Sequence, residues 1–231
     1  DTERIIGNWL KKTGNRDKVV LASKIAGGGD YTAHIRKNGF SKKGITEAIE
    51  NSLKRLQTDY MDLYQLHWPS RGVNCFGVRD YPYKTASKEA ENHLEILETL
   101  SDFIKQGKIK HIGLSNETPW GTMKYLQASE QYNLPKPVTV QNSYSLIHRG
   151  YEVGMSEVSM RENIGLLAYS PLAQGVLSGK YIDGNLPEGA IGTLFPRFIA
   201  RYRNKGSEAA VLKYLEIAKK NNLTLTELSL A

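Results

Sequence analysis

Short apolar runs alternate with amphipathic stretches along this chain, and that alternation constrains its fold more than any other feature. The runs predict buried strands at residues 19–23, 61–66, 109–114, 138–141 and 164–169. Their starts are 42, 48, 29 and 26 residues apart, which is the spacing of successive strand–helix units. Such a chain forms either a doubly wound open sheet or a (β/α)8 barrel.

The stretches between the runs predict helices. Apolar stripes at helical spacing are formed by Ile45, Ala48, Ile49 and Leu53, by Leu94, Leu97, Leu100 and Ile104, and by Met123 with Leu126. Each such stripe would cover the sheet, as crossover helices do.

Helices are also expected at both ends. The first has Ile5, Ile6, Trp9 and Leu10 at helical spacing and Gly14 as its stop. Thr224 and Glu227 match a capping box that opens another helix, of which about two turns follow. Because so short a helix is marginal in isolation and would normally continue, we expect the 231 residues to be a fragment of a longer protein.

Composition excludes several classes of protein. A single cysteine, Cys75, excludes an internal disulfide framework and a cysteine-based zinc site. No apolar run approaches the roughly 18–20 residues that cross a bilayer, so we expect no membrane partner. The net charge of +7 comes with short basic pairs such as Lys42 and Lys43, which are typical of solvated helix faces rather than of a nucleic-acid interface. We therefore expect no nucleic-acid partner; a strongly salt-dependent affinity for DNA would contradict this.

Polar or aromatic side chains follow every expected strand. They are Lys24, His67 with Trp68, Ser115 with Asn116, Gln141 with Asn142, and Tyr169 with Ser170. This pattern favours a barrel, because a barrel builds its site at the carboxyl ends of its strands. Neither G-x-G-x-x-G nor GK[ST] follows a strand, which weakens the Rossmann and P-loop alternatives. Two long segments, 68–90 and 182–206, follow strand ends and could shape a ligand site.

Five strings together resemble the signature segments of the aldo-keto reductase superfamily, in its Tas-type branch. They are VVLASK, TDYMDLYQLHWP, GKIKHIGLSNE, VTVQNSYS and LAYSPLAQGVLSGKY. The resemblance implies an α/β fold, a truncated (β/α)8 TIM barrel with barrel strands 3–7 present, as a single domain over 1–231 with both ends missing. It also implies a cytoplasmic enzyme that reduces a small carbonyl substrate with NADP(H) as cofactor.

The resemblance assigns two catalytic residues. Lys24 matches the lysine whose ammonium lowers the pKa of a proton-donating tyrosine, and His67 matches the histidine that orients the carbonyl. The family's aspartate and tyrosine lie in a D-T-A-x-x-Y segment, which Asp1-Thr2 does not match because position 6 is Ile6. The chain therefore carries half of the catalytic set, and we expect little or no reductase activity from these residues alone.

The cofactor contacts implied by the resemblance are more complete. Ser115, Asn116 and Gln141 match the residues that hold the nicotinamide carboxamide, and Tyr169 matches the aromatic that stacks on the ring. The pyrophosphate loop is matched by Ser170, Pro171, Leu172, Ala173, Gly175 and Lys180, and Arg197 is a weaker match for the adenosine end. Substrate contacts could come from Trp68, Phe76, Tyr81 and Tyr83. A non-catalytic NADP(H)-sensing subunit, like the potassium-channel β-subunits, remains an alternative.

Overall fold

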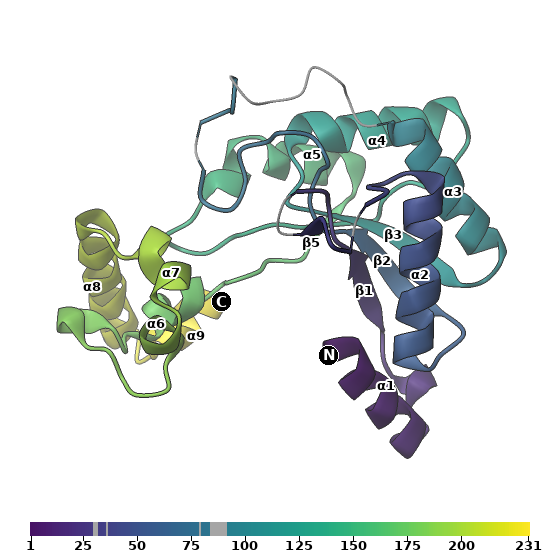
Figure 1. Ribbon diagram of the computed structural model, residues 1–231. Helices are drawn as coiled ribbons and strands as arrows, with labels where there is room; N and C mark the ends of the chain where they lie inside the picture. Colours follow the sequence, from purple (N-terminus) through teal and green to yellow (C-terminus); the bar gives the residue numbers. More distant parts are fainter. Residues whose placement is uncertain (30–31, 36, 79, 84–91) are drawn as a thin grey trace. The chain divides into compact units, whose positions relative to one another are not determined.

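The computed structural model describes residues 1–29, 32–35, 37–78, 80–83 and 92–231. Within them, one sheet holds parallel strands in chain order (Figure 1): β1 (Ala22–Ile25), β2 (Met61–Leu66), β3 (Ile109–Ser115), β4 (Thr139–Gln141) and β5 (Gly165–Leu166). A doubly wound sheet reverses its strand order at a switch point, and these strands show no reversal. The predicted α/β class with parallel strands is therefore confirmed.

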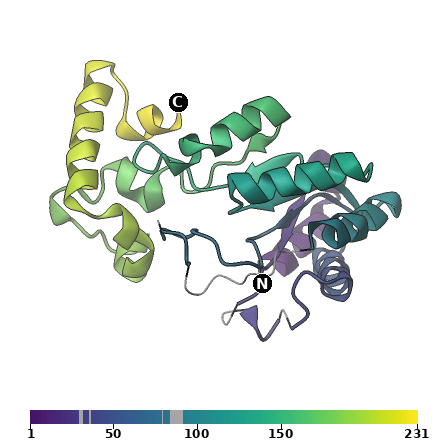
Figure 2. The same cartoon turned by 90° about the horizontal axis from the view of Figure 1, so that it is seen from above.

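Three amphipathic helices lie along this sheet (Figures 1 and 2): α2 (Lys42–Leu56), α3 (His93–Lys105) and α4 (Pro119–Gln131). α2 contacts β1 and α3, and α3 contacts β3 and α4. The stripe predicted for α2 is entirely buried. In α3 the buried face is rotated slightly, so that Ile96 and Phe103 are buried while Leu94 and Ile104 are only half-buried.

The first strand begins three residues later than predicted. Residues 19–23 were expected to be extended and buried because of Val19 and Val20, but Val20 is 83% exposed. Side chains bind the backbone groups that would have joined the ladder: Arg16 Nη1 donates to the Val19 carbonyl at 3.2 Å, and the Leu21 N–H donates to Asp62 Oδ2 at 2.9 Å. β1 therefore starts at Ala22.

The last predicted strand is also shorter than expected. Residues 164–169 form a strand at Gly165–Leu166, and Tyr169 makes an isolated parallel bridge with Ser143. The segment 182–206 is not an irregular loop, since it contains η5 (Ile182–Gly184), α6 (Ile191–Leu194), α7 (Pro196–Ile199) and η6 (Ala200–Tyr202). The remaining elements are η1 (Arg16–Lys18), η3 (Gly150–Val153), α5 (Met155–Glu162), η4 (Ala173–Ser178), α8 (Lys205–Lys220) and α9 (Leu225–Leu230).

The predicted first helix is α1 (Thr2–Thr13), and Gly14 ends it in the left-handed conformation with φ 63°. Only part of its apolar stripe is packed, because Leu10 is buried while Ile5 is 67% and Trp9 is 44% exposed. α1 also approaches α2 closely at Gly7, where a Cβ would stand 2.4 Å from the Arg55 carbonyl oxygen. The predicted capping box is confirmed at the start of α9.

The described chain forms two compact units, each with its own core. The first comprises residues 1–141 and 157–167, and the second comprises 142–156 and 168–231. The second unit buries Ala173, Val176, Leu177, Tyr181, Ile199, Tyr202, Val211 and Leu225 in one cluster. That all 231 residues belong to one barrel domain stays a prediction. Among the described residues, none of the helices has the length and apolar character needed to cross a membrane.

Candidate functional site

The carboxyl ends of β1 and β2 bring Lys24 and His67 to the same edge of the sheet. Lys24 lies opposite Gln65, and Ile25 lies opposite Leu66. The pairing continues past the strand, because the His67 N–H donates to the Ile25 carbonyl at 2.9 Å. Neighbouring strands are about 4.8 Å apart, so the two side chains start from adjacent positions.

Both titratable groups at this edge are shifted toward the neutral form. Burial lowers the pKa of Lys24. Burial, and then the positive charge of Lys24, lowers the pKa of His67 to about 4. Neither side chain forms an ion pair with a described residue. At neutral pH the imidazole is therefore uncharged and keeps one ring N–H for donation.

The turn after β3 is held by its own hydrogen bonds. Asn116 has φ 53°, donates its backbone N–H to the Gln141 carbonyl at 3.0 Å, and donates Nδ2 to the His67 carbonyl at 2.9 Å. Ser115 is buried and donates its hydroxyl to the same Gln141 carbonyl at 2.9 Å. The Gln141 side-chain amide has no partner in the described part of the chain. It can therefore both donate to and accept from a carboxamide, which fits the role expected of it.

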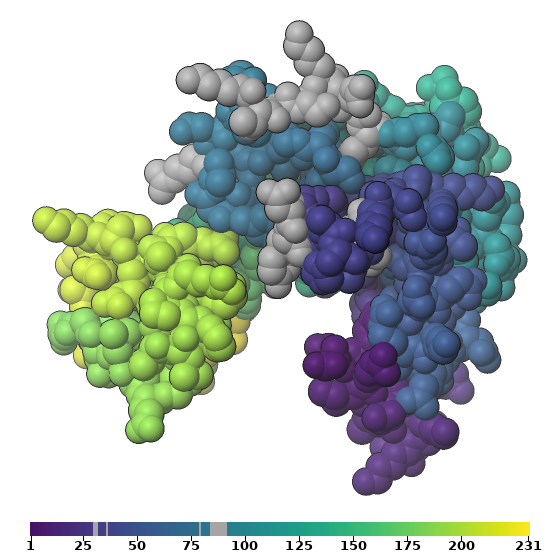
Figure 3. All heavy atoms as spheres, in the orientation of Figure 1, coloured from purple at the N-terminus to yellow at the C-terminus, as the bar shows by residue number. Residues whose placement is uncertain are grey.

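Aromatic side chains of the segment after β2 lie beside His67. The ring centroids of His67 and Trp68 are 4.8 Å apart, and those of Trp68 and Phe76 are 5.9 Å apart. Trp68 Nε1 donates to the Gly28 carbonyl at 3.0 Å. Phe76 is half-exposed in the segment drawn in blue in Figure 3, and Tyr83 is 85% exposed. Trp68 and Phe76 thus form the better-packed part of the expected pocket wall, and Tyr83 does not pack into it.

Sequence reasoning missed an ion pair next to these groups. Arg71 and Glu117 form a bidentate pair whose side chains are only 8% and 4% exposed. Each residue lies just past a strand end, four positions after His67 and one after Asn116, and their opposite charges were the available signal. Burial, and then the charge of Glu117, raises the pKa of the Cys75 thiol, which makes Cys75 a poor nucleophile.

The expected pyrophosphate loop lies in the second unit and has an unusual backbone. Ser170, Ala173 and Gly175 have φ of 54°, 49° and 90°. The Ala173 N–H donates to the Ser170 carbonyl at 2.7 Å, and the Gly175 N–H donates to the Leu172 carbonyl at 2.8 Å. These two N–H groups are therefore used within the loop, and the role of the loop in binding phosphate stays a prediction.

The cation expected at the phosphates, Lys180, lies near the loop, and Arg197, expected at the adenosine end, lies farther along the chain. A Cβ at Gly175 would stand 2.6 Å from Lys180 Cε, so the Lys180 side chain crosses the loop, and its ammonium pairs with no described carboxylate. Pro171 and Leu172 are half-buried. Arg197 is exposed in α7, with its guanidinium 4.9 Å from the ring centroid of Phe198, and α7 itself contacts η4 of the loop.

The ring expected to stack on the nicotinamide also belongs to the second unit. The Tyr169 N–H donates to the Asn142 carbonyl at 3.0 Å, and the Tyr144 N–H donates to the Tyr169 carbonyl at 3.3 Å. These bonds continue the parallel pairing of this chain segment beyond β4 and β5. The backbone of Tyr169 is therefore fixed at a strand end, as the sequence predicts.

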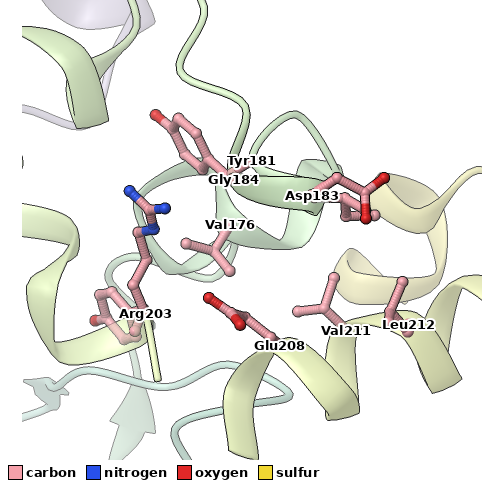
Figure 4. Close-up of a pocket in the computed structure, with 10 residues that line it drawn as sticks. Val176, Tyr181, Asp183, Gly184, Arg203, Glu208, Val211 and Leu212 are labelled. Atoms are coloured by element: carbon pink, nitrogen blue, oxygen red, sulfur yellow. The ribbon is translucent and has the colours of Figure 1, made fainter. Parts of the chain in front are cut away.

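The second unit also contains a cavity that the sequence did not predict. Its volume is about 300 Å³, and the lining includes Val176, Asp183, Arg203, Glu208 and Val211. Figure 4 shows the Glu208 carboxylate directed into the cavity between apolar walls. None of the predicted site residues lines it.

A family model for the aldo/keto reductase family matches residues 1–231, the full length of the chain. The chain belongs to the aldo/keto reductase family. The predicted resemblance is thus confirmed, including its Tas-type branch: the chain is 47% identical to Protein tas of Escherichia coli strain K12 over 232 residues, which is 100% of this chain and 66% of that protein.

Other aldo/keto reductases match less closely. An aldo-keto reductase of Babesia bovis is 39% identical over 87% of this chain and 75% of its own length. Aldo-keto reductase yakc [NADP(+)] of Schizosaccharomyces pombe is 31% identical over 99% of this chain and 61% of its own length. The chain therefore spans slightly less than two thirds of the Escherichia coli relative, in agreement with the prediction of a fragment.

The predicted site residues divide between the two units. Lys24, His67, Ser115, Asn116 and Gln141 share the carboxyl edge of one sheet. The other predicted residues belong to the second unit, namely Tyr169, Ser170, Pro171, Leu172, Ala173, Gly175, Lys180 and Arg197. The roles of all of these residues stay predictions.

Proposed function

We propose that the intact protein reduces aldehydes or ketones to alcohols with NADP(H), and that the 231 residues supply strands 3–7 of its (β/α)8 barrel. The sequential parallel order of β1 to β5 supports the barrel, since a barrel adds strands without reversal. Membership of the aldo/keto reductase family supports the reaction.

One observation carries this proposal: Lys24 and His67 lie at neighbouring strand ends, and the His67 imidazole lies beside Trp68 of the expected pocket wall. A neutral imidazole N–H can donate a hydrogen bond to a carbonyl oxygen and can stabilise the negative charge that develops on that oxygen during the reaction. The nearby ammonium of Lys24 would favour the phenolate form of a tyrosine brought next to it, and so ease release of its proton. The sequence lacks the D-T-A-x-x-Y segment that supplies this tyrosine in the family.

The donor set of the chain fits a nicotinamide cofactor, which would supply the hydride when bound. The Gln141 amide and the Ser115–Asn116 turn offer donors and acceptors for the carboxamide. Tyr169 offers an aromatic face, and Lys180 offers a cation that no described carboxylate neutralises. The preference for NADP(H) rests on family analogy, including the relative whose name carries NADP(+).

The intact parent protein tests the proposal. We expect it to oxidise NADPH in the presence of an aromatic aldehyde and to form one alcohol for each NADPH consumed, while Lys24→Met loses this activity. Tight NADPH binding without turnover of any aldehyde would contradict a reductase and favour the sensing subunit. We further propose that residues 1–231 alone show little or no activity, because the proton donor is missing from them.

A further inference from the structure

We propose that the buried Arg71–Glu117 ion pair fixes the wall of the carbonyl pocket against the turn after β3, and thereby holds in place the aromatic surface that a bulky carbonyl compound contacts in the site. The pair joins the segment that carries Trp68 and Phe76 to the turn that carries Asn116. Neither charge is used in the proposed chemistry. The inference rests on the proposed function only in taking the ligand to be a carbonyl compound. The Arg71–Glu117 contact itself is independent of that function.

The pair has several bonds that together define one geometry. Arg71 Nη1 donates to Glu117 Oε2 at 3.1 Å, and Nη2 donates both to the other oxygen of Glu117 and to Thr118 Oγ1, the latter at 3.1 Å. The Thr118 N–H donates to Glu117 at 2.7 Å. The guanidinium also lies 5.0 Å from the ring centroid of Trp120. A planar bidentate contact of this kind has directional specificity that a lysine cannot reproduce.

The first turn of α4 is built around the pair. A Cβ on Gly121 would stand 2.3 Å from both Arg71 Nη2 and Glu117 Oε1, so only glycine leaves room for the ion pair there. Thr118 caps the same helix by accepting from the Gly121 N–H at 3.2 Å. The helix start, the capping residue and the ion pair are therefore one packed unit.

The turn after β3 and the segment after β2 depend on the Arg71–Glu117 pair to different degrees for their conformation. The turn after β3 is already fixed by the bonds of Asn116 to His67 and Gln141. In the segment after β2, Trp68 is held by the bond from its Nε1 to the Gly28 carbonyl, whereas around Phe76 the Cys75 and Val78 N–H groups donate to Val73 and Cys75, within the segment itself. Loss of the Arg71 geometry should therefore loosen the pocket wall and leave the turn in place.

Arg71→Lys in the intact parent protein tests this inference. We expect the KM for a bulky aromatic aldehyde to rise about fivefold or more, with kcat, the KM for a small aliphatic aldehyde and the Kd for NADPH within about twofold of wild type. Amide hydrogen exchange without substrate should quicken about tenfold at residues 73–78 and stay unchanged at 115–116. Arg161→Lys is the matched control, because it makes the same change in an exposed helical pair with Glu157.

Two results would overturn the inference: equal changes of KM for both aldehydes, or faster exchange throughout the first unit. If Arg71→Lys does not fold, the double variant Arg71→Met with Glu117→Met leaves no buried charge and should fold with the same selective loss. If even the wild-type protein reduces no aldehyde, the proposed function fails, and hydrogen exchange alone still decides whether the pair fixes the segment.

Discussion

Asp62, near the amino ends of the strands, has charged hydrogen-bond partners, whereas Lys24 and His67, near the carboxyl ends of the same sheet, have no described counter-charge. At the amino ends of the strands, Asp62 accepts hydrogen bonds from Arg16 at 2.9 Å, Lys110 at 2.8 Å and the Leu21 N–H at 2.9 Å. At the carboxyl ends, Lys24 and His67 form no ion pair with a described residue.

The difference appears in the pKa values. Burial alone would raise the pKa of Asp62, but the hydrogen bonds from Lys110, Leu21 and Arg16 outweigh it and lower the pKa to about 2. The pKa of Lys24 and that of His67 are instead lowered by burial that no counter-charge offsets. The comparison teaches that the carboxylate of Asp62 is neutralised at the amino end of its strand, whereas Lys24 and His67, where we propose chemistry, lie beside no described counter-charge.

The largest effect is expected at the carboxyl end, on activity. Lys24→Met in the intact protein should lower kcat/KM by a factor on the order of 10³, because the proton donor loses its cationic neighbour. The free energy of unfolding should stay the same or rise, since a half-buried charge is replaced by an apolar chain of similar length. Steady-state kinetics and urea denaturation measure the two. A Lys24→Met variant that is much less stable but fully active would contradict this account, because Lys24 would then serve stability rather than chemistry.

The next effect is expected at the amino end, on stability. Asp62→Ala should lower the free energy of unfolding by about 3 kcal/mol, because it leaves the half-buried guanidinium of Arg16 without its carboxylate. Lys110→Met is the control and should cost about 1 kcal/mol or less, because the Lys110 side chain is 52% exposed. Urea denaturation at neutral pH measures both.

The same residue predicts an acid-dependent loss of stability. The pKa of Asp62 is lower in the folded protein than the ordinary value of 3.8. Its contribution is therefore complete above pH 3.8 and is lost as the pH falls toward about 2. The Asp62→Ala variant should lack this part of the pH dependence, and an unchanged acid transition would contradict the assignment.

The smallest effect is expected on stability, from a substitution of Thr139. This residue pairs in register with Gly113, which in turn pairs with Gln65 and, through it, with Lys24. The Thr139 hydroxyl oxygen is buried and has no hydrogen-bond partner in the described part of the chain. Thr139→Val should therefore raise the free energy of unfolding by up to about 1 kcal/mol. Thr139→Ser keeps the hydroxyl and serves as the control. A loss of stability in the valine variant would show that the hydroxyl does bind a partner.

The sequence predicted best where one physical signal dominated. β2 was predicted with its observed bounds because it is a buried strand inside a parallel sheet and four of its six residues are apolar, with only Asp62 and Gln65 interrupting them. The position of Lys24 and His67 at neighbouring strand ends followed from the same logic, whereas the roles expected of them came from the family resemblance.

Predictions failed where tertiary contacts overrode local preference. The β-branched Val19 and Val20 favour a strand, but side chains of Arg16 and Asp62 take the backbone bonds there. The Arg71–Glu117 pair joins residues 46 positions apart, and a charge pattern alone does not specify such a pairing. The positive φ angles of the loop at 170–175 likewise depend on its own hydrogen bonds, and its non-glycine residues give little warning of them.

The pKa of His67 tests the central claim most directly, because it reports the unneutralised charge at the carboxyl end. NMR titration of the intact protein should give a value of about 4 in the wild type. In Lys24→Met the pKa should rise but stay below 6.5, because burial, the larger cause, remains. A wild-type pKa near 6.5, or one that Lys24→Met leaves unchanged, would contradict the account.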